Sequence, residues 1–293
     1  MRNLLVVGCG DIGLRAAALL MPHYRLFALS HTPQRFCALR KNGIVPIFGD
    51  LDDPSSLSRI AGVAHDVLHF APPRNRGSRD VRTRNLLAAL TKCAIVPHRL
   101  VYISTSGVYG DCGGELVAET RPAHPQTLRA VRRRDAEMSI RQWGRRNGIS
   151  VCILRVPGIY SKERISLSRL SLPVLRECDD VYTNHIHAED LARAAVRALR
   201  CGANGRIYNV SDDSSMKMGD YFDFLARKFG LPLPQRLPRD ELRKAVPESM
   251  YSFMSESRRL DNSRMKKELG VVLKYPRISG GLDPSPSCGS GLL

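Results

Sequence analysis

The first half of the chain alternates short apolar runs with segments of helical periodicity. The apolar runs are continuous and lack the polar alternation of half-exposed strands, so helices should cover both faces of the sheet that they form. Strands that alternate with helices in this way favour a parallel sheet with crossover connections. The predicted strands are residues 4–7, 26–29, 45–48, 67–70, 100–104 and 151–154, and the predicted helices between them are residues 12–21, 33–41, 54–60, 82–93 and 127–146.

The second half is less regular. Beyond residue 155 the pattern loosens, and it then returns as a predicted helix at residues 189–200 and a predicted strand at residues 206–210. This order predicts an α/β fold, a Rossmann doubly wound parallel sheet with a smaller C-terminal substrate lobe. The chain would leave the sheet, return to it once, and leave it again near Ser211.

These departures divide the chain into two predicted domains. The dinucleotide-binding Rossmann domain would comprise residues 1–155 and about 181–212, and the smaller substrate lobe would comprise about 156–180 and 213–282. Residues 283–293 are rich in Gly, Pro and Ser, so we expect them to form a flexible tail.

A glycine-rich turn, GCGDIG, follows the first predicted strand and opens the first predicted helix. This strand, turn and helix context is that of a dinucleotide-binding site. Gly8 permits a tight turn, Gly10 lets the backbone approach a pyrophosphate, and Gly13 lets the helix pack closely on the strand. Asp11 and Ile12 would lie at the helix N-terminus, where free N–H groups face the phosphates.

The end of the second predicted strand bears on which dinucleotide binds. An acidic residue there would accept hydrogen bonds from the ribose 2′-hydroxyl of NAD. The sequence offers no carboxylate at this place and instead has Ser30, His31, Thr32 and Arg35, which suit the 2′-phosphate of NADP. We therefore expect NADP as the cofactor, with NAD as the alternative.

The net charge of +17 raises the question of a polyanionic partner. The basic residues are mostly arginines spread along the chain, and their densest run, residues 129–146, has Trp143 as its single aromatic residue. Runs of this kind are usually solvated helix faces, so we do not expect nucleic acid as a partner. An anionic substrate or cofactor would use part of the charge, whereas nucleic-acid binding would show a steep loss of affinity with salt.

The rest of the composition excludes several classes of protein. No apolar run approaches the length of about 20 residues that spans a bilayer. The eight cysteines are scattered, with no C-x-x-C and no Cys/His cluster at zinc spacing. We expect a soluble, cytoplasmic protein with reduced thiols, no metal site and no membrane partner.

Four later segments carry a family resemblance. They are Gly-Asp-Leu at 49–51, Ser-Thr-Ser-Gly-Val-Tyr-Gly at 104–110, Arg-Val-Pro-Gly-Ile-Tyr at 155–160 and His-Ile-His-Ala-Glu-Asp-Leu at 185–191. With the glycine turn, and in this order, they resemble the extended short-chain dehydrogenases/reductases, the group that includes nucleotide-sugar epimerases and dehydratases. The pattern is most similar to an atypical subgroup of NAD-dependent epimerase/dehydratase-like proteins, the YeeZ-like proteins.

This resemblance implies further site residues. Contacts to the cofactor, beside the adenine and along the dinucleotide, would come from Asp50, Leu51, Phe70 and Ala71. Thr105 matches the family's catalytic Ser or Thr, whose hydroxyl would hydrogen-bond a substrate carbonyl or hydroxyl beside the nicotinamide. Ser106 is the neighbouring candidate, and the alternative is that both small residues merely end a strand.

The family's Tyr-x-x-x-Lys motif is absent from the following helix. Aligned on Glu137, its two positions fall on Arg129 and Arg133, and no tyrosine occurs between residues 111 and 151. Arg133 could supply a fixed positive charge near the cofactor, but an arginine stays protonated at neutral pH and cannot transfer the proton. Other acid/base groups must then be sought, and the remaining candidates are His124 and Tyr160, with His185 and His187 expected to be structural.

Two functions remain open from the sequence. The first is an NADP-dependent oxidoreductase or epimerase/dehydratase-like enzyme that acts on an unknown carbonyl or sugar-like small molecule. The second is a catalytically silent dinucleotide-binding protein, a redox sensor or scaffold. A pocket of convergent polar groups over the nicotinamide would favour the enzyme, and an open or filled pocket would favour the sensor.

The resemblance also bears on assembly. The helices near residues 82–93 and 127–146 correspond to those that form a four-helix dimer interface in many family members. The second of them carries seven arginines, and like charges would repel across a two-fold axis. We therefore expect a monomer or a weak homodimer.

Overall fold

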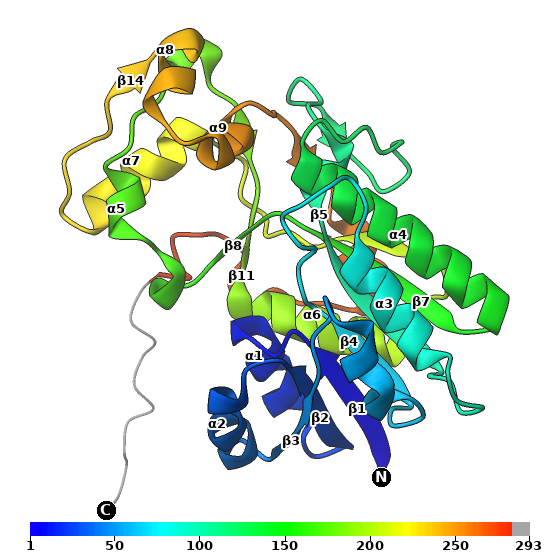
Figure 1. Cartoon of the computed structure of the whole chain (residues 1–293). Coiled ribbons are helices and arrows are strands. Elements are labelled where there is room, and N and C mark those ends of the chain that lie inside the picture. The colour runs from blue at the N-terminus through cyan, green and yellow to red at the C-terminus, as the bar shows by residue number, and fades with distance from the viewer. Residues whose placement is uncertain (283–293) are drawn as a thin grey trace, which may run out of the picture.

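The central sheet sets the architecture of the chain. In the computed structural model, which describes residues 1–282, seven parallel strands form one sheet (Figure 1). In spatial order they are β12 (Ile207–Asn209), β7 (Ser150–Val156), β5 (Arg99–Thr105), β4 (Asp66–His69), β1 (Arg2–Val7), β2 (Tyr24–Ser30) and β3 (Ile44–Phe48). Because β1 lies between β4 and β2, the direction in which strands are added reverses beside it. The predicted Rossmann topology is confirmed.

Helices cover both faces of this sheet because alternate strand residues are buried on opposite sides. Leu4 and Val6 of β1 pack in one core cluster, whereas Leu5 and Val7 pack in the other. The first face is covered by α1 (Asp11–Leu20), α2 (Phe36–Lys41), α6 (Ala188–Cys201) and α10 (Ser263–Leu269), and the second by α3 (Val81–Leu90) and α4 (Leu128–Asn147). Figure 1 shows α3 and α4 side by side on their face of the sheet.

Two of the predicted α-helices are formed partly or wholly by 3₁₀ helix, which has fewer residues per turn. Residues 33–41 form a 3₁₀ turn, η1 (Pro33–Arg35), followed by α2, and the next predicted helix is the 3₁₀ helix η2 (Pro54–Ile60). Each begins with a proline, and in η2 the Asp53 side chain accepts a hydrogen bond from the Ser55 N–H at 3.0 Å. Such short connections adopt 3₁₀ geometry because they complete few α-helical hydrogen bonds.

The segments that leave the sheet build a smaller lobe with its own apolar core. Buried members of that core include Val174, Leu175, Phe222 and Leu225. The lobe contains the helices α5 (Leu167–Leu170), α7 (Met218–Lys228), α8 (Arg239–Ala245) and α9 (Glu248–Met254), and the short strand pairs β9 (Val174–Leu175) with β14 (Arg236–Leu237) and β10 (Tyr182–Thr183) with β13 (Met216–Lys217). Strands of two residues are too short to leave a periodic pattern in the sequence, which is why none was predicted here.

The C-terminal part of the chain is shared between the two cores. Met265 and Leu269 of α10 are buried in the sheet core with α6, although residues 213–282 were expected to belong to the lobe as one segment. The parts are joined by two further strand pairs, β8 (Gly158–Tyr160) with β11 (His185–His187) and β6 (Leu116–Val117) with β15 (Arg259–Leu260). In the described part of the chain no helix has the length and hydrophobicity needed to cross a membrane. Residues 283–293, expected to form a flexible tail, lie outside the described residues.

The seven arginines of α4 do not all face outwards. Three of them, Arg129, Arg132 and Arg133, turn towards the protein and contact an aromatic ring or backbone carbonyls. The others lie along a shallow groove on the outer face, formed by Arg134, Met138, Arg141, Gln142, Arg145 and Arg146. The charge that a dimer through this face would have to accommodate is therefore smaller than the sequence suggests, but it is still of one sign.

We predict that this face keeps the protein monomeric or weakly dimeric. Its arginines would meet their symmetry mates across a two-fold axis, and their repulsion is strongest at low ionic strength. Light scattering should therefore show less association at low salt than at high salt. Replacing Arg141→Gln and Arg145→Gln together should weaken this salt dependence, and a tight wild-type dimer through α3 and α4 at low salt would contradict the charge argument.

Candidate cofactor and substrate site

The glycine turn between β1 and α1 is shaped by three separate constraints. Gly8 has a φ of +88°, and a Cβ added there would lie 2.4 Å from the backbone nitrogen of Ala71, just beyond β4. A Cβ on Gly13 would lie 3.0 Å from the Gly8 carbonyl oxygen, whereas a Cβ on Gly10 would meet nothing within 4 Å. The turn therefore packs against the end of β4 and leaves open space at Gly10, where a dinucleotide phosphate would approach.

An ionic bridge joins this turn to the segment that enters the lobe. Asp11, in the first turn of α1, accepts hydrogen bonds from Arg15 at 2.7 Å and from Arg164 of η4 (Lys162–Arg164) at 3.1 Å. Burial alone would raise the pKa of Asp11, but the two arginines hold it below its usual value. Asp11 therefore stays ionised, and its arginines offset a charge that would otherwise repel a phosphate at the N-terminus of α1.

The residues expected at the adenosine end of the cofactor lie around the end of β2. Arg35 is exposed, and its guanidinium donates a hydrogen bond to the Cys9 carbonyl oxygen at 2.8 Å, which ties it to the glycine turn. The Ser30 hydroxyl accepts a hydrogen bond from the Thr32 N–H at 3.2 Å, and His31 between them is exposed. This corner therefore presents a cation and a hydroxyl to a ligand.

The other residues expected to contact the cofactor differ in how far their side chains are exposed to a ligand. Ile12 and Leu51 are each 8% exposed and pack in the two sheet cores, so mainly their backbone can reach a ligand. Asp50 is partly exposed and is held by a hydrogen bond from the Asp52 N–H at 2.9 Å. Phe70 packs against the core beside the Gly8 contact. The predicted set thus surrounds the carboxyl ends of β1, β2, β3 and β4, with side chains and backbone both contributing.

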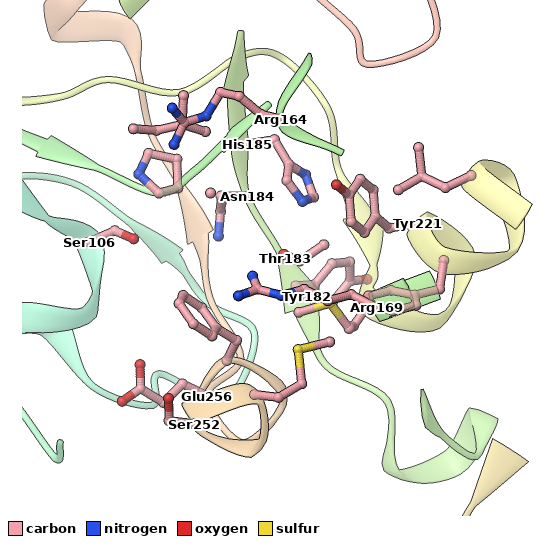
Figure 2. A pocket seen from close by; sticks show the side chains of 18 of the residues that line it. Ser106, Arg164, Arg169, Tyr182, Thr183, Asn184, His185, Tyr221, Ser252 and Glu256 are labelled. Carbon is pink, nitrogen blue, oxygen red and sulfur yellow. The ribbon is translucent and has the colours of Figure 1, made fainter. Parts of the chain in front are cut away.

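A cleft of about 430 Å³ lies beyond the ends of β5 and β7. One wall contains Thr105 and Ser106, from the end of β5 and the following η3 (Ser106–Tyr109). The facing wall comes from β10, β11 and the lobe helices and includes Tyr182, His185 and Tyr221 (Figure 2). Met250 and Phe253 also line the cleft. Doubly wound proteins bind ligands outside the carboxyl ends of their strands, so this cleft has the position of a substrate site.

Consecutive hydroxyl groups at the end of β5 have different roles. Ser104 is buried, and its hydroxyl donates a hydrogen bond to Glu137 Oε1 at 2.7 Å. The Thr105 hydroxyl oxygen accepts a hydrogen bond from the Gly107 N–H at 3.2 Å, which leaves its proton free to be donated to a ligand. Thr105 and Ser106 both line the cleft, so the two predicted catalytic hydroxyls lie together on one wall.

The two arginines at the Tyr-x-x-x-Lys positions have different environments. Arg129 lines the cleft, with its guanidinium carbon 4.0 Å from the centroid of the Phe253 ring. Arg133 is held against β5, because it donates hydrogen bonds to the Ile103 carbonyl oxygen at 2.6 Å and to the Tyr102 hydroxyl at 3.0 Å. Arg133 was expected to supply a fixed positive charge near the cofactor; both of these hydrogen bonds come from its Nη1, and Arg133 is not among the residues that line the cleft.

The cleft also contains acid/base groups that the sequence analysis did not assign to catalysis. Tyr221 of α7 stacks on His185 of β11 with ring centroids 4.1 Å apart, and both residues line the cleft (Figure 2). Burial lowers the pKa of His185 to about 3, so its imidazole is neutral at physiological pH. His185 was expected to be structural, and Tyr221 lies in a helix that matches no motif. No local signal in the sequence joins the two.

A buried polar cluster adjoins this stacked pair. Asp212 is 3% exposed, and burial raises the pKa of its carboxyl to about 7. The Tyr160 hydroxyl interacts with the Asp212 carboxyl group, which raises the pKa of Tyr160 further, and His185 Nδ1 has no hydrogen-bond partner among the described residues. Tyr160 is buried and His124 is exposed, and neither belongs to the cleft wall.

The described residues contain no group of three or more His, Cys, Asp or Glu side chains that could hold a metal ion.

Comparison with known proteins identifies the family. The model of the NAD-dependent epimerase/dehydratase family matches residues 4–211, from β1 to just beyond β12. The chain belongs to the NAD-dependent epimerase/dehydratase family. The resemblance inferred from the motifs is confirmed, and with it the expectation of a nicotinamide dinucleotide cofactor.

Individual members of the family and of the fold are distant in sequence. The GDP-6-deoxy-D-mannose reductase of Pseudomonas aeruginosa is 26% identical over 271 residues, which cover 83% of this chain and 87% of the relative. A solved, functionally unknown conserved protein from Silicibacter pomeroyi is 26% identical, with a TM-score of 0.77 and 96% of each chain covered. A UDP-glucose 4-epimerase from Thermotoga maritima, solved with UDP-glucose, has a TM-score of 0.76 over 93% of this chain and 94% of its own, and at 18% identity this likeness concerns the fold alone.

Substitutions at Gly8 and Gly10 should separate folding from cofactor binding. Gly8→Ala would force a side chain into a positive φ and against the Ala71 backbone, so we expect a loss of stability of about 3 kcal/mol or more. Gly10→Ala should fold like the wild type, because its Cβ meets no atom, but the methyl group should weaken dinucleotide binding. Thermal melts and fluorescence titration measure the two effects, and unchanged binding by Gly10→Ala would place the pyrophosphate elsewhere.

Proposed function

We propose that this protein is an NADP-dependent oxidoreductase, or an epimerase/dehydratase-like enzyme, acting on a small carbonyl- or sugar-containing molecule. The observation that carries the proposal is the convergence of Thr105, Ser106, His185 and Tyr221 on one cleft at the ends of β5 and β7. A pocket with a few convergent polar groups is the usual form of a small-molecule site. The relative from Pseudomonas aeruginosa is named as a reductase of a GDP-linked deoxy sugar, which supports a sugar-like substrate.

The choice of NADP rests on the charge near the end of β2. Arg35 is bonded to the Cys9 carbonyl oxygen, close to the glycine turn, and Ser30 offers a hydroxyl in the same corner. A 2′-phosphate would gain charge-assisted hydrogen bonds from such a cation, whereas a 2′-hydroxyl would gain much less. NAD, the cofactor in the family's name, is the alternative.

The proton that accompanies hydride transfer must come from a group other than the family's tyrosine. When hydride reaches a carbonyl carbon, negative charge develops on the oxygen, and the Thr105 hydroxyl is placed to donate a hydrogen bond to it. Tyr221 is the phenol that we assign as proton donor, because it lines the cleft; burial raises its pKa, so it is protonated at neutral pH but is a weaker acid than a free tyrosine. The imidazole of His185 is stacked on it and stays neutral because burial lowers its pKa to about 3, so it can position the phenol or hydrogen-bond a ligand but is a poor proton acceptor.

A second candidate function is a silent dinucleotide-binding sensor or scaffold. The specific observation in its favour is that both positions of the catalytic motif hold arginines, one of which is bonded to β5. A protein of this kind would bind the dinucleotide and turn over no substrate. NADPH consumption with carbonyl and sugar-nucleotide compounds detects a reductase, and conversion of the compound without net NADPH consumption detects an epimerase or dehydratase, which regenerates its cofactor in each turnover. The sensor or scaffold would show neither.

The cofactor preference is directly measurable. We expect NADPH to bind more tightly than NADH in fluorescence titration, because Arg35 and Ser30 occupy the place of the carboxylate found in NAD-selective sites. Ser30→Asp should repel the 2′-phosphate and shift the preference towards NADH. Ser263→Asp, on the exposed start of α10, is the matched control and should change neither affinity. Equal affinities or a preference for NADH in the wild type would contradict the assignment.

The role of the β5 hydroxyl is tested by two substitutions at Thr105. Thr105→Val keeps the shape but removes the donor, so turnover should fall about a hundredfold or more, while NADPH binding should persist. Thr105→Ser retains the hydroxyl and should keep most of the activity. Turnover is followed as NADPH consumption, or as product formation where no cofactor is consumed, with whichever carbonyl or sugar-nucleotide compound the wild type converts. Unchanged turnover in Thr105→Val would remove this residue from the mechanism, and NADPH binding without any turnover would favour the sensor.

A further inference from the structure

Arg129 of α4 is one of the charged residues that line the cleft. It lies in the first turn of α4, at the position that matches the family's catalytic tyrosine, and it lines the same cleft as Thr105 and Ser106. A residue at this position stands beside the part of the substrate that reacts. The identity of its side chain therefore bears on which chemical group the substrate carries there.

The guanidinium of Arg129 has few partners of its own. Its contact with the Phe253 ring, 4.0 Å from the centroid, is a cation–π interaction, which orients the group without neutralising it. Among residues 1–282 it makes no hydrogen bond or ion pair with a carboxylate. Partial burial of its side chain lowers its pKa, although the residue as a whole is still exposed at the cleft. A guanidinium that is accessible and lacks a carboxylate partner can form charge-assisted hydrogen bonds with an anion that enters the cleft.

The nearby acid does not cancel this charge. Glu256 lines the cleft and attracts Arg129, but its carboxylate is 2.7 Å from the guanidinium of Arg258. Arg258 is itself fixed by a hydrogen bond to the Gly110 carbonyl oxygen at 2.7 Å. Two arginines therefore share one carboxylate, and this end of the cleft keeps one positive charge.

The neighbouring arginine behaves differently, which isolates the role of Arg129. Arg133, four residues along the same helix, donates hydrogen bonds from Nη1 to the Ile103 carbonyl oxygen and the Tyr102 hydroxyl. Arg129 thus lines the cleft, whereas Arg133 is held against β5 and is not part of the cleft lining. The planar fork of a guanidinium matches a carboxylate through two parallel N–H donors, and a cleft of about 430 Å³ has the size for a sugar-like acid.

We propose that Arg129 binds a carboxylate of the substrate next to the Thr105 hydroxyl, so that the substrate is a hydroxy or oxo acid, such as a sugar acid, and not a neutral sugar. This inference rests on the proposed function for the identity of the cleft as the substrate site. Arg129 is then the specificity-determining residue, and a neutral analogue would leave its charge without a partner.

The test compares acids with neutral molecules of the same shape. The full-length protein without cofactor is titrated with D-glucuronate and D-glucose, with lactate and propane-1,2-diol, and with inorganic phosphate, while NMR follows the arginine Nε–H signals. The Arg129 signal is assigned by its loss in Arg129→Gln. Each acid should shift this signal and bind about ten- to a hundredfold more tightly than its neutral partner. Arg129→Gln should abolish that preference, and Arg129→Lys, which keeps the charge without the fork, should retain part of it.

A control variant and a test of folding accompany the titrations. Arg146→Gln, on the exposed outer face of α4, should leave the acid preference unchanged, and thermal melts confirm that each variant is folded. The proposal is overturned if neither acid is preferred over its neutral partner, if the preference survives in Arg129→Gln, or if phosphate binds more tightly than both carboxylates and loses this affinity in Arg129→Gln. Because no cofactor is present, the result is independent of the NADPH titration, so failure of the proposed function would be seen separately.

Discussion

The buried pair between Glu137 of α4 and Arg155 of β7 is the interaction on which the site depends. Arg155 donates two hydrogen bonds to the carboxylate, at 3.1 and 2.8 Å, and Ser104 of β5 donates a third at 2.7 Å. The side chains of Glu137 and Arg155 are 0% and 2% exposed. Arg134 also bonds Glu137, at 3.2 Å, so it is removal of Glu137 that would leave the buried Arg155 without its ionic partner, at a cost of about 3–5 kcal/mol. One helix is thereby bonded to two adjacent strands at the level where those strands end.

The same pair determines where the cleft residues stand. Arg129, Arg133 and Glu137 follow one another at intervals of four residues, so they lie on one face of α4. Anchoring Glu137 therefore brings Arg133 against β5 and Arg129 to the cleft. On the other side, the guanidinium of Arg155 lies 4.5 Å from the Tyr109 ring centroid, and the Tyr109 hydroxyl bonds strand β12 at 2.7 Å. The sheet side of the cleft thus rests on a continuous buried network, while the lobe side rests on apolar packing.

The sequence predicts the features that depend on residues close to one another along the chain. The glycine turn, the strands and the Thr105 hydroxyl are predictable because each depends on neighbours within a few residues and on the order of β and α segments. The inward turn of Arg133 depends on a carbonyl and a hydroxyl of β5, which spacing along a helix does not reveal. The pairing of Tyr221 with His185 depends on a lobe whose two-residue strands leave no pattern. Most of the fold can therefore be predicted, and the expected cofactor residues stay a prediction, whereas the pairing of Tyr221 with His185 required tertiary contacts.

The ionic bridge from the glycine turn to Arg164 connects the expected phosphate position with the cleft. Arg164 lines the cleft and also bonds Asp11 at the start of α1. A ligand that draws this guanidinium into the cleft would leave Asp11 with Arg15 as its remaining partner and would make the N-terminus of α1 less favourable for a phosphate. By linkage, a dinucleotide would weaken the hold on that ligand by the same factor. If each ligand lowers the affinity for the other in this way, the bridge would favour dissociation of one ligand while the other is still bound.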